Sequence, residues 1–372
     1  MSSSLHALGL PPSPTATVYC EGNFGRLDGK TANGLVRHSE RYRILSVIDS
    51  QAAGQDAGAV LDGIANGIPV VADLGEALAM APERPDVFIF GVAPASGMLT
   101  PVERGVMLAA LGAGLHLING LHEFLNDDPA FVAAAAARSV SIVDVRRPPA
   151  KKDLHMFTGA VAALPGRRIA VLGTDGAIGK RTTALILTRA LRARGIRAVM
   201  VGTGQTGLIQ GARHGIALDA IPCQFCSGEV EAAVLGAHAD GQPEVIVIEG
   251  QGALSHPAYL SSAYILRGSQ PQAVVLQHAP MRKRLSDFPA LPMPSPASEI
   301  ALIETFSNTK VIGLCINHEG MDDGQVTAAI ALYEVELAIP ATDALTRSPE
   351  RLVEMVLRAF PELVREPVAL TP

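Results

Sequence analysis

Apolar residues occur along this chain in short runs, and the segments between the runs place apolar residues at helical spacing. Short apolar runs bounded by turn-forming residues are typical of buried strands. Strands that alternate with helices predict an α/β fold with mainly parallel sheets and right-handed crossovers. In the first half of the chain the runs are Ala16–Tyr19, Tyr42–Ile48, Pro69–Ala72, Val87–Phe90, Leu115–Ile118 and Ser141–Val145.

A proline pair divides this pattern into two halves. Pro148 and Pro149 can continue neither a strand ladder nor a helix interior, so we place a domain boundary there. We expect a disordered lead-in over residues 1–14, a Rossmann-like domain over residues 15–150, a linker over residues 151–166 and a second α/β domain over residues 167–372. The apolar runs of the second half are Ile169–Leu172, Ala198–Val201, Val245–Ile248, Ala273–Leu276 and Val311–Ile316, and an amphipathic helix is expected near Pro349–Phe360.

The run Ile169–Leu172 leads into a glycine-rich turn, Gly173–Gly179, and then into Lys180 and a helical pattern. A strand, a glycine-rich loop and a helix in this order direct backbone N–H groups to one point at the positive end of a helix dipole. The result is a phosphate cradle, and the alternative is a tight turn with an incidental lysine. We predict that phosphate is bound by Gly173, Thr174, Asp175, Gly176, Ala177, Gly179, Lys180, Arg181, Thr182 and Thr183.

This loop departs from the usual phosphate-loop pattern in two ways. Five residues, one more than usual, separate Gly173 from Gly179, and Arg181 stands where a hydroxyl residue usually binds magnesium. Hydroxyl groups follow only at Thr182 and Thr183. The pattern therefore favours phosphate binding and argues against a magnesium ligand directly after the lysine.

Glycine-rich segments with polar side chains follow two other predicted strands. The run Ala198–Val201 ends in GTGQTGLIQG, and Val245–Ile248 ends in EGQGALSHPAY. Ligands of open parallel sheets lie beyond the carboxyl ends of the strands, and glycines let the backbone approach them. We predict that Gln205, Thr206 and Gln251 bind substrate.

Glu249 stands at the tip of the second of these strands, and His256 follows in the same loop. An acid at the end of a buried strand beside a phosphate loop is typical of a metal or water site, while the simpler alternative is a helix cap. A histidine before proline is often structural, but in this loop it is a candidate acid or base. We predict that both residues are catalytic.

In the first half, Asp49 ends a strand where dinucleotide-binding proteins place the acid that holds a ribose. The glycine fingerprint that should precede it is irregular, since GNFG does not have the spacing G-x-G-x-x-G. We therefore prefer a Rossmann-like lobe without a dinucleotide site. Basic residues around the first crossover meet an acidic substrate or form a solvated helix face. They are Lys30, Arg37, Arg41 and Arg43, of which Lys30 and Arg41 are predicted to bind substrate.

Composition limits the classes of function. The chain has 372 residues, of which 48% are hydrophobic, enough for two domains, and its net charge of −6 argues against general nucleic-acid binding. The N-terminus lacks the charged region and apolar run of a signal peptide, and no apolar stretch reaches membrane-spanning length. We expect a cytoplasmic homo-oligomer that acts on small molecules. Cys223 and Cys226 form a lone C-x-x-C, which we interpret as buried free thiols and not as a metal site.

Several segments together resemble one known family. GTDGAIGKRTT, GTGQTGLIQG, IEGQGALSHPAY and the N-terminal segments KTANGL, RY, IDS and AG look like motifs of the DUF1611 family over nearly the whole chain. GTDGAIGK and IEGQGAL also resemble dethiobiotin synthetase. The first resemblance implies a Rossmann-like N-terminal lobe, a P-loop C-terminal domain, and N-acetylation of a D-amino acid such as D-glutamate by acetyl-CoA.

Three functions remain open at this point. The first is the CoA-dependent N-acetyltransferase. In this case Lys180, Arg181 and the basic run Arg282–Arg284 could neutralise the phosphates of CoA without magnesium. The second is an ATP- and magnesium-dependent ligase or kinase of the dethiobiotin synthetase type, with Asp175 and Glu249 on magnesium. The third is a nucleotide-binding regulatory protein without catalysis. The D-preference rests on the resemblance alone.

Overall fold

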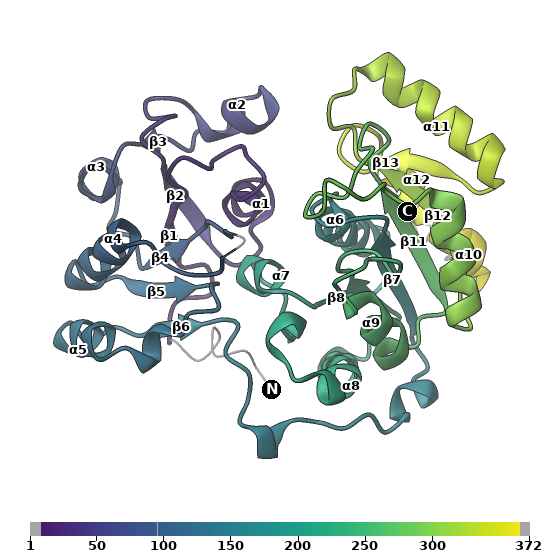
Figure 1. The fold of residues 1–372 in the computed structure, drawn as a ribbon, viewed down its shortest axis with the longest axis horizontal. Coiled ribbons are helices and arrows are strands. Elements are labelled where there is room, and N and C mark those ends of the chain that lie inside the picture. Colours follow the sequence, from purple (N-terminus) through teal and green to yellow (C-terminus); the bar gives the residue numbers. More distant parts are fainter. Residues whose placement is uncertain (1–8, 95, 365–372) are drawn as a thin grey trace, which may run out of the picture. The chain divides into compact units, whose positions relative to one another are not determined.

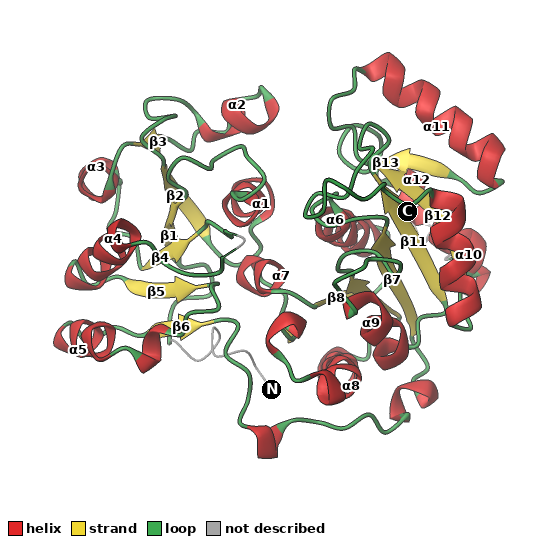
Figure 2. Cartoon of the chain, in the orientation of Figure 1, coloured by secondary structure: helices red, strands yellow, loops and turns green. Residues whose placement is uncertain are grey.

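A computed structural model describes residues 9–94 and 96–364, and in it the chain forms two compact units (Figure 1). The first unit contains the described residues up to Asp153 together with Gly204–Ile221. The second contains Leu154–Thr203 and the described residues from Pro222 onward. Each unit combines a mainly parallel sheet with helices, as Figure 2 shows. Most of the predicted lead-in, residues 1–8, lies outside the described residues.

The first unit is built on a six-stranded parallel sheet. Its strand order is β3-β2-β1-β4-β5-β6, which is the order of a Rossmann fold, and the strand order reverses between β1 and β4. The strands are β1 (Thr15–Tyr19), β2 (Arg43–Ile48), β3 (Val70–Val71), β4 (Val87–Phe90), β5 (His116–Asn119) and β6 (Ile142–Asp144). The helices are α1 (Lys30–His38), α2 (Ala57–Asp62), α3 (Leu74–Met80), α4 (Pro101–Gly112) and α5 (Pro129–Ala137).

Side-chain caps start several of these helices. Asp56, Asp73 and Thr100 accept hydrogen bonds from backbone N–H groups in the first turns of α2, α3 and α4. Such caps satisfy donors that a helix cannot satisfy internally. Between the helices and the sheet, Tyr19 stacks on Phe90 with ring centroids 5.5 Å apart, in a core of aliphatic and aromatic side chains.

The second unit is built on a seven-stranded sheet with the order β13-β12-β11-β7-β10-β8-β9. The central strands are apolar and buried on both faces, as expected where helices cover a parallel sheet. The strands are β7 (Arg167–Gly173), β8 (Ala198–Gly202), β9 (His214–Gly215), β10 (Val245–Glu249), β11 (Ala273–His278), β12 (Lys310–Ile316) and β13 (Ala341–Asp343). The helices are α6 (Lys180–Ala193), α8 (Cys223–Gly241), α9 (Ser261–Ser269), α10 (Pro296–Phe306), α11 (Asp323–Leu337) and α12 (Glu350–Ala359). The short strands β9 and β13 were not predicted.

One segment departs from the predicted domain boundaries. Residues 204–221, which lie within the range predicted for the second domain, belong to the first unit. Their helix α7 (Gln205–Gln210) is buried along its whole length and contacts α1. The hydroxyls of Thr31 and Thr206 are 3.0 Å apart, and the Glu40 N–H donates to the Gln210 carbonyl at 2.9 Å. Apolar periodicity predicts a buried helix but not the sheet on which the helix packs.

The segment predicted as a linker, residues 151–166, is held in place by hydrogen bonds to α8. Two buried glutamates of α8 hold its backbone: Glu229 accepts the His155 N–H at 2.6 Å, and Glu231 accepts the N–H groups of Thr158 at 2.6 Å and Val161 at 3.1 Å. Polar groups buried with hydrogen bonds of this kind fix a segment without regular secondary structure. The chain therefore joins the second unit from Leu154 onward.

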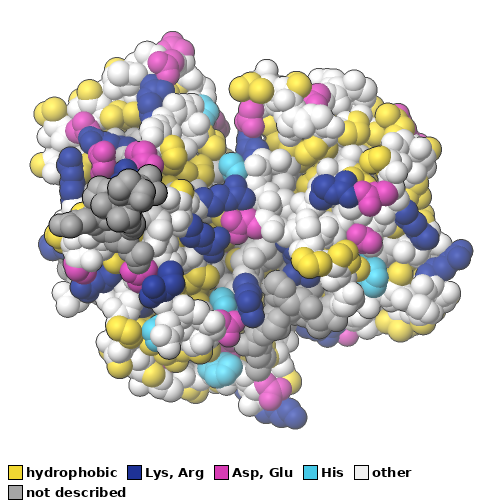
Figure 3. Space-filling model, turned by 180° about the vertical axis from the view of Figure 1, so that it is seen from behind, with side chains coloured by type: hydrophobic (Ala, Val, Ile, Leu, Met, Phe, Trp, Pro, Cys, Tyr) yellow, Lys and Arg dark blue, Asp and Glu magenta, His cyan; other side chains and the backbone are white. Residues whose placement is uncertain are grey.

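The surface and the cysteines add two observations. On the face drawn in Figure 3, Lys and Arg side chains lie among Asp and Glu side chains. Within the described residues no helix is both long enough and apolar enough to cross a membrane. Cys226 is buried as predicted, but Cys223 is exposed, because it is the first residue of α8.

Gly250, directly after β10, provides a test of the packing between β10 and β7. A Cβ at Gly250 would lie 2.0 Å from the Val171 carbonyl oxygen, whereas a Cβ at Gly241 in the same unit would meet nothing within 4 Å. We expect Gly250→Ala to destabilise the protein by at least about 3 kcal/mol, the upper range for overpacking. Gly241→Ala should be neutral or stabilising by up to about 1 kcal/mol. Urea unfolding measures both, and equal stabilities would contradict this description of the close contact.

Candidate P-loop site

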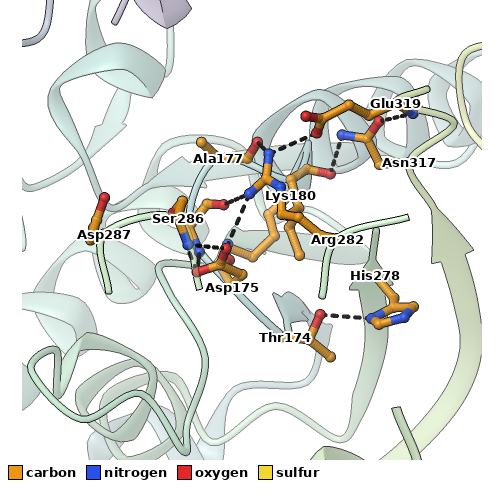
Figure 4. A network of polar contacts seen from close by, with 12 residues as sticks. Thr174, Asp175, Ala177, Lys180, His278, Arg282, Ser286, Asp287, Asn317 and Glu319 are labelled. Atoms are coloured by element: carbon orange, nitrogen blue, oxygen red, sulfur yellow. Dashed lines mark hydrogen bonds and ion pairs between the residues drawn. The ribbon is translucent and has the colours of Figure 1, made fainter. Parts of the chain in front are cut away.

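The glycine-rich loop runs from the end of β7 to the start of α6 and turns its carbonyl groups toward the protein. Arg282 donates to the carbonyls of Gly176 at 2.9 Å and Ala177 at 3.3 Å, and Asn317 donates to the Ile178 carbonyl at 3.1 Å (Figure 4). Two loop residues adopt left-handed backbone conformations: Ala177 has φ +48° and Gly179 has φ +101°. Alternating conformations of this kind form a concave nest of N–H groups.

The N–H groups of the same loop are left for a ligand. Among the described residues, the backbone N–H groups of Ala177, Ile178 and Gly179 donate to no protein acceptor. Because the carbonyls are held on the other side and α6 begins at Lys180, these donors and the helix dipole favour an anion. The residues present therefore fit a phosphate group.

Asp175 holds the loop in this conformation. Its side chain is fully buried and pairs with Arg282 at 3.1 Å. The carboxylate also accepts the Ser286 N–H at 2.9 Å and the Gly176 N–H at 2.7 Å. Arg282 makes a further ion pair with Glu319 at 2.8 Å, so this one guanidinium bridges Asp175, two loop carbonyls and a second acid. The pair fixes the loop through charge-assisted hydrogen bonds.

This arrangement differs from the role considered for the basic run Arg282–Arg284, which was to neutralise phosphates of the ligand. Arg282 is committed to the loop itself, Lys283 Nζ donates to the Pro280 carbonyl, and Arg284 donates to the Ala290 carbonyl. Sequence showed three adjacent positive charges, but the direction of each side chain depends on a turn that the sequence does not specify.

Lys180 lies across the loop and is 5% exposed. Its Nζ donates to the Asp175 carbonyl oxygen. A Cβ at Gly173 would lie 3.0 Å from Lys180 Cδ and 2.9 Å from the Gln277 carbonyl oxygen, so glycine is required where the lysine stem passes. The lysine charge is thus held beside the nest of N–H groups.

The loop hydroxyls have protein partners. Thr183 Oγ1 donates to Gln277 Oε1 at 2.6 Å, and Thr174 Oγ1 lies 2.9 Å from His278 Nδ1. All four of these side chains are buried. Burial lowers the pKa of His278 to about 4, so the imidazole is neutral at neutral pH. Of the two hydroxyls that could replace the missing magnesium ligand after Lys180, that of Thr183 is thus engaged with Gln277, while Thr182 is half-buried.

Glu249 lies at the same sheet edge as the loop, because β10 pairs with β7 and Glu249 is in register with Val171. The carboxylate is buried and accepts the Thr203 N–H at 3.0 Å. Gln251 donates to the Thr203 hydroxyl at 3.3 Å. The glycine after Glu249 is explained by its close approach to β7, so packing accounts for part of this glycine-rich motif.

His256 is held in the loop that follows β10. Its Nδ1 lies 3.2 Å from the N–H groups of both Ala258 and Tyr259, and its ring stacks on Tyr259 with centroids 4.4 Å apart. Burial lowers its pKa. The fully buried Glu299 of α10 anchors the loop by accepting the Leu254 N–H at 2.5 Å and the Ser255 hydroxyl at 2.6 Å.

The remaining predicted substrate residues belong to the first unit. Lys30 begins α1, Arg41 stacks over Tyr42 at 5.6 Å, and Gln205 and Thr206 begin α7. The second unit thus brings together the loop, Glu249, Gln251 and His256. Two other members of the basic cluster form ion pairs, Arg37 with Asp62 and Arg43 with Glu83.

In the first unit, protein contacts engage the groups at which a Rossmann fold would bind a dinucleotide. The Asp49 carboxylate accepts N–H groups of Gly22 at 3.1 Å and Phe24 at 3.0 Å, so the acid holds the loop after β1. At the start of α1, the Ala32 N–H donates to the Gly91 carbonyl at 3.2 Å. A ribose and a pyrophosphate would need these groups, which agrees with a Rossmann-like lobe that lacks the glycine fingerprint.

Several functional contacts were not predicted. Asn317 directly follows β12, which is the one signal that sequence offered for it, and Gln277 stands one residue from the end of β11. Glu299 and Ser286 lie in a helix and a loop without any motif. They were missed because their roles depend on contacts between segments far apart in the chain.

Comparisons with known proteins agree with this architecture. Residues 155–353 match the C-terminal P-loop domain of DUF1611, and residues 50–148 match its N-terminal Rossmann-like domain. The chain is a member of the DUF1611 family. The family and the fold class predicted from sequence are thereby confirmed.

Relatives of this DUF1611 protein include curated enzymes and a solved structure. A D-glutamate N-acetyltransferase of Tritonibacter scottomollicae is 31% identical over 72% of this chain and 79% of that protein. A D-glutamate N-acetyltransferase of a Pseudoalteromonas species is 29% identical over 72% of this chain and 80% of that protein. The crystal structure of a DUF1611 family protein from Anabaena variabilis superposes with a TM-score of 0.86 and 33% identity, covering 93% of this chain and 100% of that one.

The Asp175–Arg282 pair can be tested by removing one partner. Arg282→Met leaves a buried carboxylate without its counter-charge, so we expect a loss of about 3 kcal/mol in the free energy of unfolding. The double variant Asp175→Asn, Arg282→Met should recover part of this loss, and Lys283→Met should cost under about 1 kcal/mol. Chemical denaturation measures all three, and equal effects of Arg282→Met and Lys283→Met would contradict the assignment.

The pKa of His278 predicts a pH dependence of stability. The folded state takes up this proton only near pH 4, whereas the unfolded chain takes it up near pH 6.5. Unfolding is therefore favoured progressively as the pH falls from 6.5 to 4, by on the order of 3 kcal/mol in total. His278→Asn, which removes the titrating ring but keeps a polar side chain, should lose less stability over the same range. Parallel stability–pH curves for the two proteins would count against this prediction.

Proposed function

We propose that this DUF1611 protein transfers the acetyl group of acetyl-CoA to the amine of D-glutamate, with the P-loop holding the phosphates of CoA. The curated relatives support an enzyme of the acyltransferase class, an amino-acid N-acetyltransferase, since both are named D-glutamate N-acetyltransferases. The donor and the role of the loop are inferred from the geometry of the second unit.

The observation that carries the proposal is that the loop offers donors for phosphate while its magnesium ligands are engaged. Asp175 is paired with Arg282, Thr183 donates to Gln277, and Arg181 replaces the usual hydroxyl residue. Nucleotide triphosphate chemistry relies on magnesium to neutralise the transferred phosphoryl group. The phosphates of CoA take no part in acetyl transfer and serve only for binding, which N–H groups and Lys180 can provide. This favours acetyl-CoA over ATP with magnesium.

The chemistry assigned to the residues is simple. The lone pair of a neutral amine attacks the thioester carbonyl, a base takes the amine proton, and the carbon–sulfur bond breaks as the base passes that proton to the departing sulfur, so that CoA leaves as the thiol. Glu249 is the predicted base, because it is a buried carboxylate at the sheet edge that carries the loop. The two carboxylates of the acceptor require cations, for which Lys30 and Arg41 are predicted.

Thiol release from acetyl-CoA tests the proposed activity directly. We expect release with D-glutamate, weaker release with L-glutamate, and no change on adding EDTA. Lys180→Met should raise KM for acetyl-CoA roughly 10-fold or more, since a charged hydrogen bond to phosphate is lost. The exposed Lys283 provides the control Lys283→Met, for which no change is expected. ATP hydrolysis that requires magnesium, together with no affinity for CoA, would overturn the proposal.

A further inference from the structure

His256 carries a buried polar atom that its surroundings leave without a partner. The residue is 5% exposed, and its Nε2 has no hydrogen-bond partner among the described residues. An unsatisfied buried donor or acceptor is costly, so such an atom in a native protein calls for an explanation. A ligand that supplies the missing partner is one explanation with testable consequences.

The contacts of the other ring nitrogen decide which kind of group Nε2 is. Nδ1 faces two backbone N–H groups, those of Ala258 and Tyr259, each at 3.2 Å, and therefore serves as the acceptor. In a neutral imidazole one nitrogen accepts and the other carries the hydrogen. Nε2 is thus an N–H donor. The low pKa that burial gives this histidine keeps the ring in the neutral form at neutral pH.

A chain of contacts places this donor beside the P-loop. Ser286 donates its N–H to Asp175 at 2.9 Å, and the next residue, Asp287, accepts the Tyr259 hydroxyl at 2.9 Å. Tyr259 stacks on the His256 ring, and Phe288 meets the ring edge with centroids 5.6 Å apart. Three consecutive residues in the segment between β11 and α10, Ser286 to Phe288, therefore join the loop to the histidine, and Figure 4 shows Ser286 beside Asp175 with Asp287 on its far side.

The neighbouring carboxylates do not satisfy the donor. Asp175 is occupied by Arg282, Ser286 and Gly176, and the hydrogen bond recorded at Asp287 comes from Tyr259. The P-loop also has donors that need acceptors. Within the described part of the chain, the N–H groups of Ala177, Ile178 and Gly179 have no acceptor. A ligand that carries phosphate groups offers acceptors both for these N–H groups and for the histidine.

We propose that His256 binds a phosphate group of the ligand in the P-loop through its Nε2–H and does not act as the general base. The inference rests on the proposed function in taking CoA as the ligand, but the binding step concerns any pyrophosphate-bearing ligand of this loop. Since Nε2 carries the hydrogen and Nδ1 is already engaged, the neutral ring has no lone pair to accept the amine proton. The role originally predicted for this residue, a catalytic acid or base, changes to that of a binding residue.

Equilibrium binding provides the first test. We expect His256→Ala to raise Kd for CoA and for inorganic pyrophosphate roughly 10- to 100-fold, the effect of losing a hydrogen bond to a charged group. His256→Gln, which keeps an N–H donor near the same position, should recover part of the affinity. His238→Ala on α8 is the control, with no change expected. Unchanged affinity for both ligands in a folded His256→Ala protein, checked by circular dichroism, would overturn the proposal.

A truncated substrate provides the second test and separates phosphate binding from base catalysis. Acetyl-pantetheine carries the thioester but lacks the phosphates. We expect His256→Ala to lower kcat/KM with acetyl-CoA but not with acetyl-pantetheine, whereas Glu249→Gln should lower both if Glu249 is the base. An equal loss with both substrates in His256→Ala would refute the phosphate role. If the wild-type protein transfers no acetyl group, the proposed function fails, while the binding comparison still decides the role of His256.

Discussion

The geometry of the P-loop depends on one buried ion pair. Asp175 is fully buried, and an isolated carboxylate in that position would be strongly unfavourable without a counter-charge. Arg282 supplies the charge and, with the same guanidinium, binds two carbonyls of the loop. Because the carbonyls are drawn to one side, the N–H groups face the other. The orientation of these N–H groups, on which the proposed anion binding rests, thus depends on a contact made 107 residues along the chain.

The Rossmann-like unit and the P-loop unit are built from similar elements but differ in the polar groups that remain for a ligand. In the first unit, Asp49 and the Gly91 carbonyl satisfy the groups that would otherwise bind a dinucleotide. In the second unit, side chains satisfy the carbonyls of the loop and leave its N–H groups for a ligand. Both sheets are mainly parallel but differ in strand order, and the loops at their carboxyl ends differ in which polar groups the protein satisfies by itself.

Sequence predicted most of the fold because its signals are local. Buried strands appear as apolar runs, and a strand followed by a glycine-rich loop, a lysine and a helix has few structural interpretations. Prediction from sequence failed where the structure depends on contacts between segments far apart in the chain. The unit in which α7 packs depends on its complementarity with α1, and the direction of the Arg282 side chain depends on the position of Asp175. The tautomer of His256 depends on two N–H groups whose approach only the folded loop defines.

The same distinction between local signals and distant contacts explains why the sequence leaves ATP with magnesium open as a ligand of the loop, whereas the contacts in the structure are the reason for proposing another ligand. In sequence, Asp175, Thr182 and Thr183 appear as possible magnesium ligands next to a phosphate-binding lysine. In the structure, the carboxylate is neutralised by an arginine and the hydroxyl of Thr183 is given to Gln277. To bind Asp175 or Thr183, a divalent cation would have to break a buried ion pair or a buried hydrogen bond, whereas a phosphate group meets N–H donors that have no other acceptor among the described residues. The charge balance inside the loop is therefore the basis for proposing a ligand that brings negative charge without its own metal ion.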